Sequence, residues 1–404
     1  MQRLLENWMS NKLRKLTAAA VISLFLQGCS MFSDDEEVYS PLPAIQAEFT
    51  PEIEWRRSIG SGMGDFYSQT RTLLANEHLY SASRSGLVKA LNPLTGAEIW
   101  RQDLSEQPVF NRFDESKKAL LSGGIASGYG MVFIGSENAV LFALNEKTGE
   151  VIWQVETDGE VIASPVVDEG LVIVNTASGS LISFEVQSGE QRWIQSAELP
   201  SLTLRGNNSP ITTNGAAIYG RSDGKLAAVF LANGRLIWEV DVAKPKGAND
   251  LDRLVDVNGQ AVSRGTDVYT SAYNGELMSI ELRSGKVLWK RAYASVKDLT
   301  VGGFELFLTD TQGRVHAIDR RNGSTLWSQN SLALRGVTAP TIVGNYIVVG
   351  DKEGYLHWLD RKNGKLVAQQ LIDNDGLFSK ALNSSELLYV QSRSGDLVAI
   401  KKPN

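Results

Sequence analysis

The sequence predicts an all-β protein whose chain forms an eight-bladed β-propeller of four-stranded antiparallel blades. Three observations predict this fold class. A short stretch ending in Trp recurs along the chain, the last copy is incomplete, and a matching strand lies near the start. Length alone would suggest two or three domains for 404 residues. The repeat overrides that expectation, because one propeller uses nearly the whole chain.

The repeat combines a tight turn, an alternating strand, a second turn and a Trp. Two examples are "SGLVKALNPLTGAEIW", which ends at Trp100, and "NGELMSIELRSGKVLW", which ends at Trp289. A Gly-containing dipeptide suits a hairpin turn, and alternating apolar and polar residues predict a strand with one buried face. Self-similarity at a period of roughly 40–50 residues indicates an array of units that bury their faces against each other. The repeat positions are Trp100, Trp153, Trp193, Trp238, Trp289, Trp327 and, in the seventh copy, Ala368.

The number of blades follows from the incomplete last copy. The tail "SGDLVAIKKPN" ends after the third strand of an eighth unit, whereas "EIEWRRSIG" near the start carries Trp55 at the repeat position. An N-terminal strand that completes the last blade closes the ring and removes exposed sheet edges. We therefore expect eight blades over residues 51–404.

The row of repeat tryptophans has two readings. The rings could form a ligand-binding cage, or each Trp could lie between neighbouring blades. Burial of one Trp removes roughly 150–250 Å² from water, which favours the structural role. Ala368 then predicts one blade interface that is less tightly packed than the others.

The N-terminal region predicts export and anchoring. Residues 1–28 contain a basic start and an apolar run too short to span a bilayer, which is typical of a secretory signal peptide. The stretch "LFLQGCS" resembles the lipobox of bacterial lipoproteins, which implies lipidation of Cys29, the only cysteine, and an anchor in the outer membrane. An incidental cysteine in a signal peptide is the alternative. Residues 29–50 are acidic and contain proline, so we expect a flexible tether.

Charge and motifs argue against nucleic acid and against catalysis. The formal net charge is −6, and removal of the basic signal peptide makes it more negative, so phosphate binding is not expected. The three histidines, His78, His316 and His357, lie in distant repeats without metal-ligand spacing. The glycines of 60–66 are not followed by a helix pattern and predict a loop. We expect no enzyme activity, no metal and no cofactor.

A rival function comes from the repeat itself. The pattern "ALNxxTGxxxW" resembles the repeat of quinoprotein dehydrogenases, which are eight-bladed propellers with a quinone and a calcium ion. That resemblance implies an oxidoreductase or, more broadly, a ligand-binding propeller in the periplasm. Cys29 alone cannot form the disulfide of adjacent cysteines that is common in that family.

The segment after Trp100 is long, and so are two successive connections between blades. They follow Trp193 and Trp238, and alternating strand direction places both on one face of the propeller. The first contains Leu202, Leu204 and Arg205, and apolar side chains beside an Arg are typical of a protein-binding hot spot. Alternatively, the leucines cover their own blade and Arg205 pairs with an acid of the neighbouring loop. The residues alone leave both readings open.

Several motifs together resemble one family over essentially the whole mature chain. The lipobox, the eight repeats, "SLTLRG", "DRLVDV" and "EGYLHWLDRKNGKLVAQQ" are similar to the outer membrane protein assembly factor BamB family. The resemblance implies a lipoprotein scaffold on the periplasmic face of the outer membrane that binds the POTRA domains of BamA and supports insertion of β-barrel proteins. It places the BamA-binding motif on Leu202, Leu204, Arg205 and Asp256, with Asn258 where the family has a second acid. Nascent outer-membrane proteins are further candidate partners.

Overall fold

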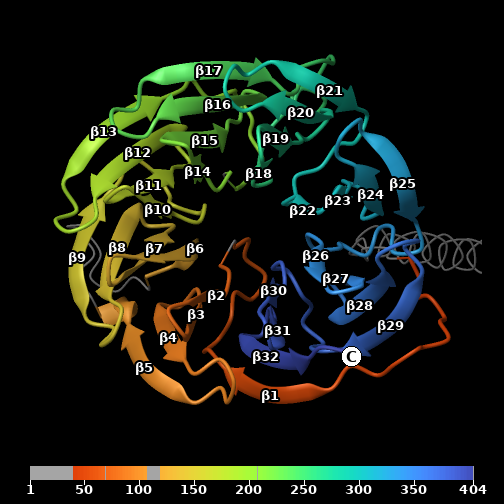
Figure 1. Ribbon diagram of the computed structural model, residues 1–404. Helices are drawn as coiled ribbons and strands as arrows, with labels where there is room; N and C mark the ends of the chain where they lie inside the picture. The colour runs from red at the N-terminus through yellow and green to blue at the C-terminus, as the bar shows by residue number, and fades with distance from the viewer. Residues whose placement is uncertain (1–39, 69, 107–118, 207, 404) are drawn as a thin grey trace, which may run out of the picture. The chain divides into compact units, whose positions relative to one another are not determined.

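The computed structural model describes residues 40–403 except 69, 107–118 and 207. Within the unit Ser40–Asn404, eight four-stranded antiparallel sheets follow one another around a central axis (Figure 1). This arrangement is the predicted eight-bladed propeller, so the fold class is confirmed. No helix in the described ranges is long and apolar enough to cross a membrane.

The strands have the following bounds. Blade 1 contains β2 (Leu73–Ala75), β3 (His78–Ala82), β4 (Leu87–Leu91) and β5 (Glu98–Asp103), followed by the short 3-10 helix η1 (Leu104–Glu106); blade 2 contains β6 (Leu121–Gly128), β7 (Met131–Ser136), β8 (Val140–Asn145) and β9 (Val151–Glu156); blade 3 contains β10 (Val166–Asp168), β11 (Leu171–Asn175), β12 (Ser180–Glu185) and β13 (Gln191–Ser196); blade 4 contains β14 (Ile211–Thr213), β15 (Ala216–Gly220), β16 (Lys225–Phe230) and β17 (Leu236–Asp241). Blade 5 contains β18 (Val262–Arg264), β19 (Asp267–Thr270), β20 (Leu277–Glu281) and β21 (Val287–Arg291); blade 6 contains β22 (Thr300–Gly302), β23 (Glu305–Thr309), β24 (Val315–Asp319) and β25 (Ser324–Gln329); blade 7 contains β26 (Thr341–Val343), β27 (Tyr346–Gly350), β28 (Tyr355–Asp360) and β29 (Leu366–Leu371); blade 8 contains β30 (Leu382–Asn383), β31 (Leu387–Gln391), β32 (Asp396–Lys401) and β1 (Ile53–Ser58).

The last blade is closed by the N-terminal strand, as the sequence predicts. Strand β1 pairs antiparallel with β32, and Trp55 lies opposite Ala399. The two ends of the propeller are therefore hydrogen-bonded into one sheet. Opening the ring would require the loss of this whole strand pairing, which makes the propeller a rigid platform.

Each repeat tryptophan lies against the next blade. The Trp193 indole, for example, donates from Nε1 to the Leu231 carbonyl at 2.8 Å, and a Cβ added to Gly234 would lie 2.7 Å from the Trp193 ring. Glycine is therefore required in this turn because the indole occupies the space of a side chain. The same contact with the next blade is made by Trp55, Trp100, Trp153, Trp193, Trp238, Trp289 and Trp327.

The exception at Ala368 has a topological reason. Each indole is received by the turn between the third and fourth strands of the following blade, and blade 8 has no such turn, since its fourth strand β1 comes from the N-terminal side. Ala368 instead pairs across the sheet with Trp358, which is fully buried in a hydrophobic cluster that joins blades 7 and 8. The expectation of a loosely packed interface is wrong, because Trp358 on the neighbouring strand β28 fills the space between the two blades.

The segment preceding β1 packs against blade 7. The Glu48 amide donates to the Val367 carbonyl at 2.8 Å, and the buried Arg335 donates to the Ser40 carbonyl at 2.8 Å. Phe49 meets Trp358 edge-on, with ring centroids 5.5 Å apart. Residues 40–50 of the predicted tether are therefore held on the propeller, which corrects the boundary at residue 51. Residues 1–39, with the predicted signal peptide and Cys29, lie outside the described residues.

Candidate protein-binding site

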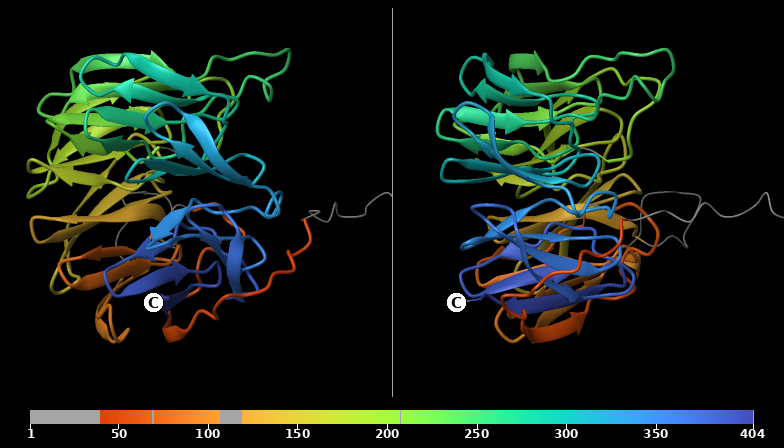
Figure 2. Two further views of the ribbon diagram at one scale, coloured as in Figure 1. Left: turned by 45° about the vertical axis from the view of Figure 1, so that its right-hand side comes forward. Right: turned by 90° about the vertical axis from the view of Figure 1, so that its right-hand side faces the viewer.

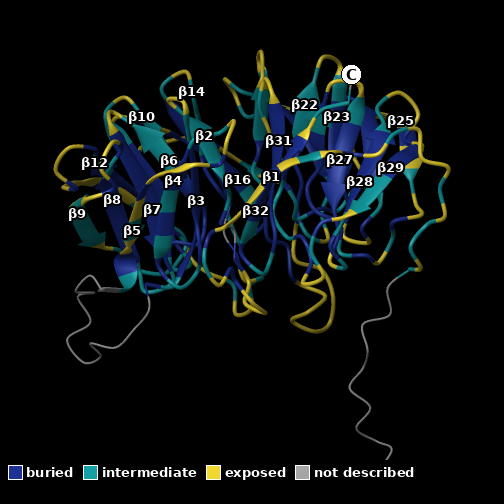
Figure 3. Cartoon of the chain, turned by 90° about the horizontal axis from the view of Figure 1, so that it is seen from below, coloured by how far each residue is buried: buried dark blue, intermediate teal, exposed yellow. Residues whose placement is uncertain are grey.

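The connections between blades project from one side of the propeller. They run from the fourth strand of one blade to the first strand of the next, and the longest of them extend below the disc in Figure 3 and to one side in Figure 2. The turns between second and third strands reach the same side, since Arg205 of a connection contacts Glu137 of such a turn. We call this side the loop face.

The first long connection carries the predicted cluster of Leu202, Leu204 and Arg205. It joins β13 to β14, and its leucine side chains remain partly exposed to solvent. Leu202 is 40% exposed, and Leu204 is half-buried. The Arg205 side chain is 48% exposed, so both an apolar and a cationic group are accessible on the loop face.

Arg205 belongs to an ion network that crosses the loop face. Its guanidinium lies 3.0 Å from Glu137 and 3.3 Å from Glu160, both on the side of blade 2. Glu137 also accepts two hydrogen bonds from Arg84, at 2.7 and 2.9 Å, and the Arg84 guanidinium lies 3.7 Å from the centre of the Phe66 ring. Arg205 is therefore paired within the molecule, but with acids of blade 2 and not with those of the next connection. Sequence reasoning missed Arg84 and Glu137, because they lie in short turns with no unusual pattern.

Asp256 supports the cluster from beneath. It lies on the second long connection, is fully buried, and accepts a hydrogen bond from the Leu204 amide at 3.2 Å. Burial raises the pKa of Asp256 although the Leu204 amide opposes that shift. Asn258 is 7% exposed and lines a cavity next to Leu204 and Arg205. Asp256 therefore positions the connection, and both residues are buried, whereas the sequence grouped them with the surface contacts.

Two substitutions of Asp256 distinguish the effect of its charge on stability from the effect of its hydrogen bond. Because the pKa of this acid is higher in the folded than in the unfolded protein, ionisation above about pH 4 costs stability. Asp256→Asn keeps an acceptor without the charge, so its melting temperature at pH 7 should equal or exceed that of the wild type. Asp256→Ala leaves the Leu204 amide unpaired and should lose about 1–3 kcal/mol. Denaturant unfolding at pH 5 and pH 7 measures both effects, and equal destabilisation by Asn and Ala would contradict this role.

A cavity of about 440 Å³ opens at the centre of the loop face. Residues from six of the inter-blade connections line it, including Met63 and Phe66 of the predicted loop 60–66. A Cβ on Gly62 would lie 2.0 Å from the Arg393 carbonyl, so the backbone of this loop approaches its neighbour too closely for any side chain. The glycines therefore serve loop packing.

Two histidines occupy equivalent structural places. His316 on β24 contacts Asp310 at 3.1 Å, and His357 on β28 contacts Asp351 at 2.8 Å, so both are strand residues that hold a turn of their own blade. In the described part of the chain no group of three or more His, Cys, Asp or Glu side chains could hold a metal ion.

Comparison with known proteins agrees with the geometry. The fold defines the chain as a closed eight-bladed propeller of quinoprotein-like repeats, and a family model described as outer membrane protein assembly factor BamB matches residues 84–329. The chain therefore belongs to the BamB family, as its motifs predict. The relative of that name from Yersinia pestis is 40% identical over 394 residues, covering 97% of this chain and 100% of the relative. The one from Vibrio cholerae serotype O1 is 42% identical over 383 residues, covering 95% and 96%.

Solved structures show the same fold. The crystal structure of BamB from Moraxella catarrhalis superimposes with a TM-score of 0.77 at 24% identity, covering 87% of this chain and 100% of that one. A quinohemoprotein alcohol dehydrogenase from Comamonas testosteroni gives a TM-score of 0.69 at 12% identity, covering 87% and 76%. At such identities the likeness concerns the fold alone.

Proposed function

We propose that this chain is a non-catalytic scaffold lipoprotein of the outer-membrane β-barrel assembly complex. In this role it binds the periplasmic POTRA domains of BamA through the loop face and supports the folding and insertion of outer-membrane proteins. Lipidation at Cys29 would hold it on the periplasmic face of the outer membrane. The relatives' shared name, outer membrane protein assembly factor, supports the biological setting.

The observation that carries the proposal is the accessible apolar surface on the loop face. Six of the 19 exposed large hydrophobic side chains of the described residues lie on its inter-blade connections, and exposed apolar groups gathered on one face are typical of a protein-binding surface. Phe66 is 58% exposed and Leu251 is 68% exposed. The members of this set are Phe66, Tyr67, Leu199, Leu202, Leu251 and Leu334.

The ion network explains how Arg205 could act at an interface. The Glu137 carboxylate accepts hydrogen bonds from Arg84 and also forms an ion pair with Arg205. The guanidinium of Arg205 is therefore held in place before a partner binds. A carboxylate of the partner can replace Glu160, which lies 3.3 Å away and is itself 35% exposed. Leu202 would cover this contact from water, and a charge-assisted hydrogen bond strengthens when water is excluded.

Closure of the ring supports the scaffold role mechanically. The loop face is carried by eight blades that are joined through seven tryptophan contacts and through the β1–β32 pairing. The positions of the connections are therefore determined by the sheets beneath them, which limits the ordering entropy lost on binding.

A pull-down from detergent-solubilised outer membranes tests the site. Leu202→Ala/Arg205→Ala should reduce recovery of BamA with the tagged chain at least about tenfold, since hot-spot residues each contribute roughly 1–2 kcal/mol or more. Arg101→Ala is the matched control, because the Arg101 side chain is 69% exposed on β5, outside the inter-blade connections. The control should retain wild-type recovery.

The thermal melt separates binding from stability. Both variants should melt within a few degrees of the wild type by circular dichroism, because the replaced side chains are largely exposed. Unchanged recovery of BamA by the double variant would contradict the assignment of the loop face. A large fall in its melting temperature would assign Leu202 and Arg205 an intramolecular role instead.

A further inference from the structure

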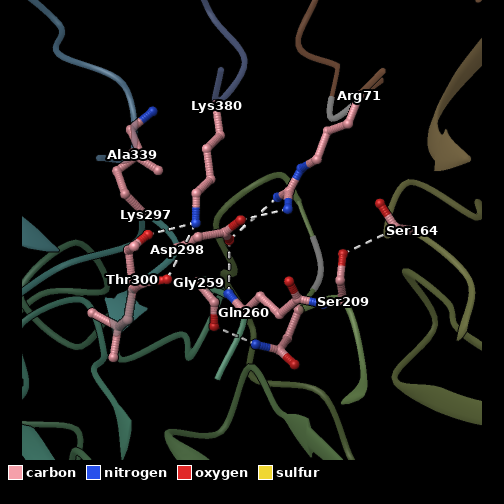
Figure 4. Close-up of polar contacts among 12 residues, drawn as sticks. Arg71, Ser164, Ser209, Gly259, Gln260, Lys297, Asp298, Thr300, Ala339 and Lys380 are labelled. Carbon is pink, nitrogen blue, oxygen red and sulfur yellow. Dashed lines mark hydrogen bonds and ion pairs between the residues drawn. The ribbon is translucent and has the colours of Figure 1, made fainter. Parts of the chain in front are cut away.

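In seven of the eight blades, the residue two places before the innermost strand occupies an equivalent position of the repeat. It is uncharged in four of them, as Ser164, Ser209, Gln260 and Ala339. In the three others it is Arg71 before β2, Asp298 before β22 and Lys380 before β30, which come together around the axis (Figure 4). Blades far apart in sequence therefore contribute a charged cluster to the centre of the loop face.

The acid of this cluster is already shared. The Arg71 guanidinium contacts both carboxylate oxygens of Asp298, one of them at 3.2 Å. The backbone N–H of Gln260 donates to the same carboxylate at 2.9 Å. Although burial opposes the shift, the charges of Arg71 and Lys380 hold the pKa of Asp298 below its ordinary value. Asp298 is therefore ionised and neutralises one cation.

Two lysines remain beside this pair. The Lys380 ammonium donates to the Thr300 hydroxyl at 2.6 Å and to the Leu299 carbonyl at 3.4 Å, which are neutral groups. Lys297 lines the same cavity, and no ion pair within 4.0 Å links its ammonium to a carboxylate of the described residues. Two acids, Asp65 and Asp298, line the cavity together with six cations, so the cavity carries an excess of positive charge in a protein of net negative charge. The cations are Arg71, Arg205, Lys297, Lys352, Lys380 and Arg393.

Two other cations that line the cavity, Arg205 and Arg393, have partners of their own. Arg205 is paired with Glu137 and Glu160. Arg393 donates to the Gly64 carbonyl at 2.8 and 3.1 Å and lies 3.9 Å from Asp65. The lysines Lys297 and Lys380 are therefore the cations of this cavity that we assign to ligand binding.

We propose that this central cavity is a binding site for a small oxyanion with two or more negative charges, such as a phosphate or a polycarboxylate. Its volume, about 440 Å³, is within the range of small-ligand sites. Lysine ammonium groups act as point charges and suit the tetrahedral or branched geometry of such anions. Lys297 and Lys380 would bind the anion directly, while the Thr300 hydroxyl and the Leu299 carbonyl keep the Lys380 ammonium in place. The proposal does not depend on the partner of the loop face.

The site should depend on pH. Burial lowers the pKa of Lys380 to about 8, with Asp298 opposing and Arg71 adding to the shift. Burial also lowers the pKa of Lys297, and nearby Lys352 and Arg71 act in the same direction while Asp298 acts against it. A lysine must be protonated to bind an anion, so affinity should fall by about tenfold between pH 7 and pH 9.

Isothermal titration calorimetry of the full chain in detergent tests the proposal, with inorganic phosphate and citrate as probes in chloride buffer of constant ionic strength. At least one probe should bind with a stoichiometry near one. Lys297→Met/Lys380→Met should weaken it by about a hundredfold, because two charged hydrogen-bond donors are removed. A preference between the probes identifies the class of ligand.

Lys290→Met is the matched control, since Lys290 is 59% exposed on β21 and pairs with Glu276 away from the cavity. It should retain wild-type affinity. A circular-dichroism melt of the double variant checks folding, and retention of the fold is expected because Arg71 still neutralises Asp298. The proposal is overturned if neither probe binds, or if the folded double variant binds as tightly as the wild type. Single variants Lys297→Gln and Lys380→Gln provide the same comparison should the double variant not fold.

Discussion

Replacing Trp238 by Ala is expected to lower the free energy of unfolding by about 3–5 kcal/mol. The indole is 7% exposed, donates to the Leu282 carbonyl at 2.8 Å and lies against Gly285 of the next blade. The substitution removes the hydrogen bond and opens a cavity between two sheets that cannot approach each other, since both are held in a closed ring. Both losses fall on one blade interface.

Urea unfolding followed by fluorescence and circular dichroism measures this loss. Ile237→Ala is the control, because Ile237 precedes Trp238 on β17 but is 36% exposed on the other side of the strand. We expect the control to lose less than about 1.5 kcal/mol, in proportion to its smaller buried area. Equal losses in the two variants would show that the indole does not join the blades.

Replacing Arg335 by Ala is expected to cost a similar amount, about 3–5 kcal/mol. Arg335 is fully buried; its Nε donates to Asp351 at 2.8 Å, its guanidinium also contacts Glu353, and it binds the Ser40 carbonyl at 2.8 Å. Although burial opposes it, His357 and Arg335 hold the pKa of Asp351 below its ordinary value. Without Arg335 this buried carboxylate loses its cationic partner.

The pH dependence gives a second readout for Arg335. A carboxyl group with a lowered pKa stabilises the fold above the unfolded value of 3.8, and this contribution is lost as pH falls below it. The wild type should therefore lose more stability than Arg335→Ala between pH 5 and pH 3. Lys365→Ala is the control, because the Lys365–Glu48 pair is more than half exposed and solvent screening leaves it little effect on stability. A loss in Arg335→Ala no larger than in this control would contradict the role of the buried pair.

Much of the fold could be predicted because its signals are local. A tight turn, an alternating strand and a Trp repeat at a constant spacing, so the number of blades and the closing strand around Trp55 follow from counting copies. The looser interface expected at Ala368 was wrong, because the number of repeat tryptophans does not determine which turn of the next blade packs against each indole. That turn is absent from blade 8, and Trp358 on the neighbouring strand fills the interface.

The candidate site was located only in part. Connection lengths directed attention to Leu202, Leu204 and Arg205, and their exposure agrees with a surface cluster. The burial of Asp256 was not predictable, because an acid in a loop is usually solvated and its bond to the Leu204 amide joins two connections. Aligning the residue two places before each innermost strand would have found the charged axial cluster, but that comparison requires the strand boundaries.

By itself the sequence determined the architecture, the closure of the ring, the repeat tryptophans and the family. These properties depend on periodic local patterns that every blade repeats, so each copy reinforces the others. Only the tertiary structure decided how Arg205 is paired, that residues 40–50 pack on blade 7, and that Arg71, Lys297, Asp298 and Lys380 share one cavity. Those contacts join residues from different blades, and their energies depend on burial and on charges brought close together in space, which no local pattern encodes.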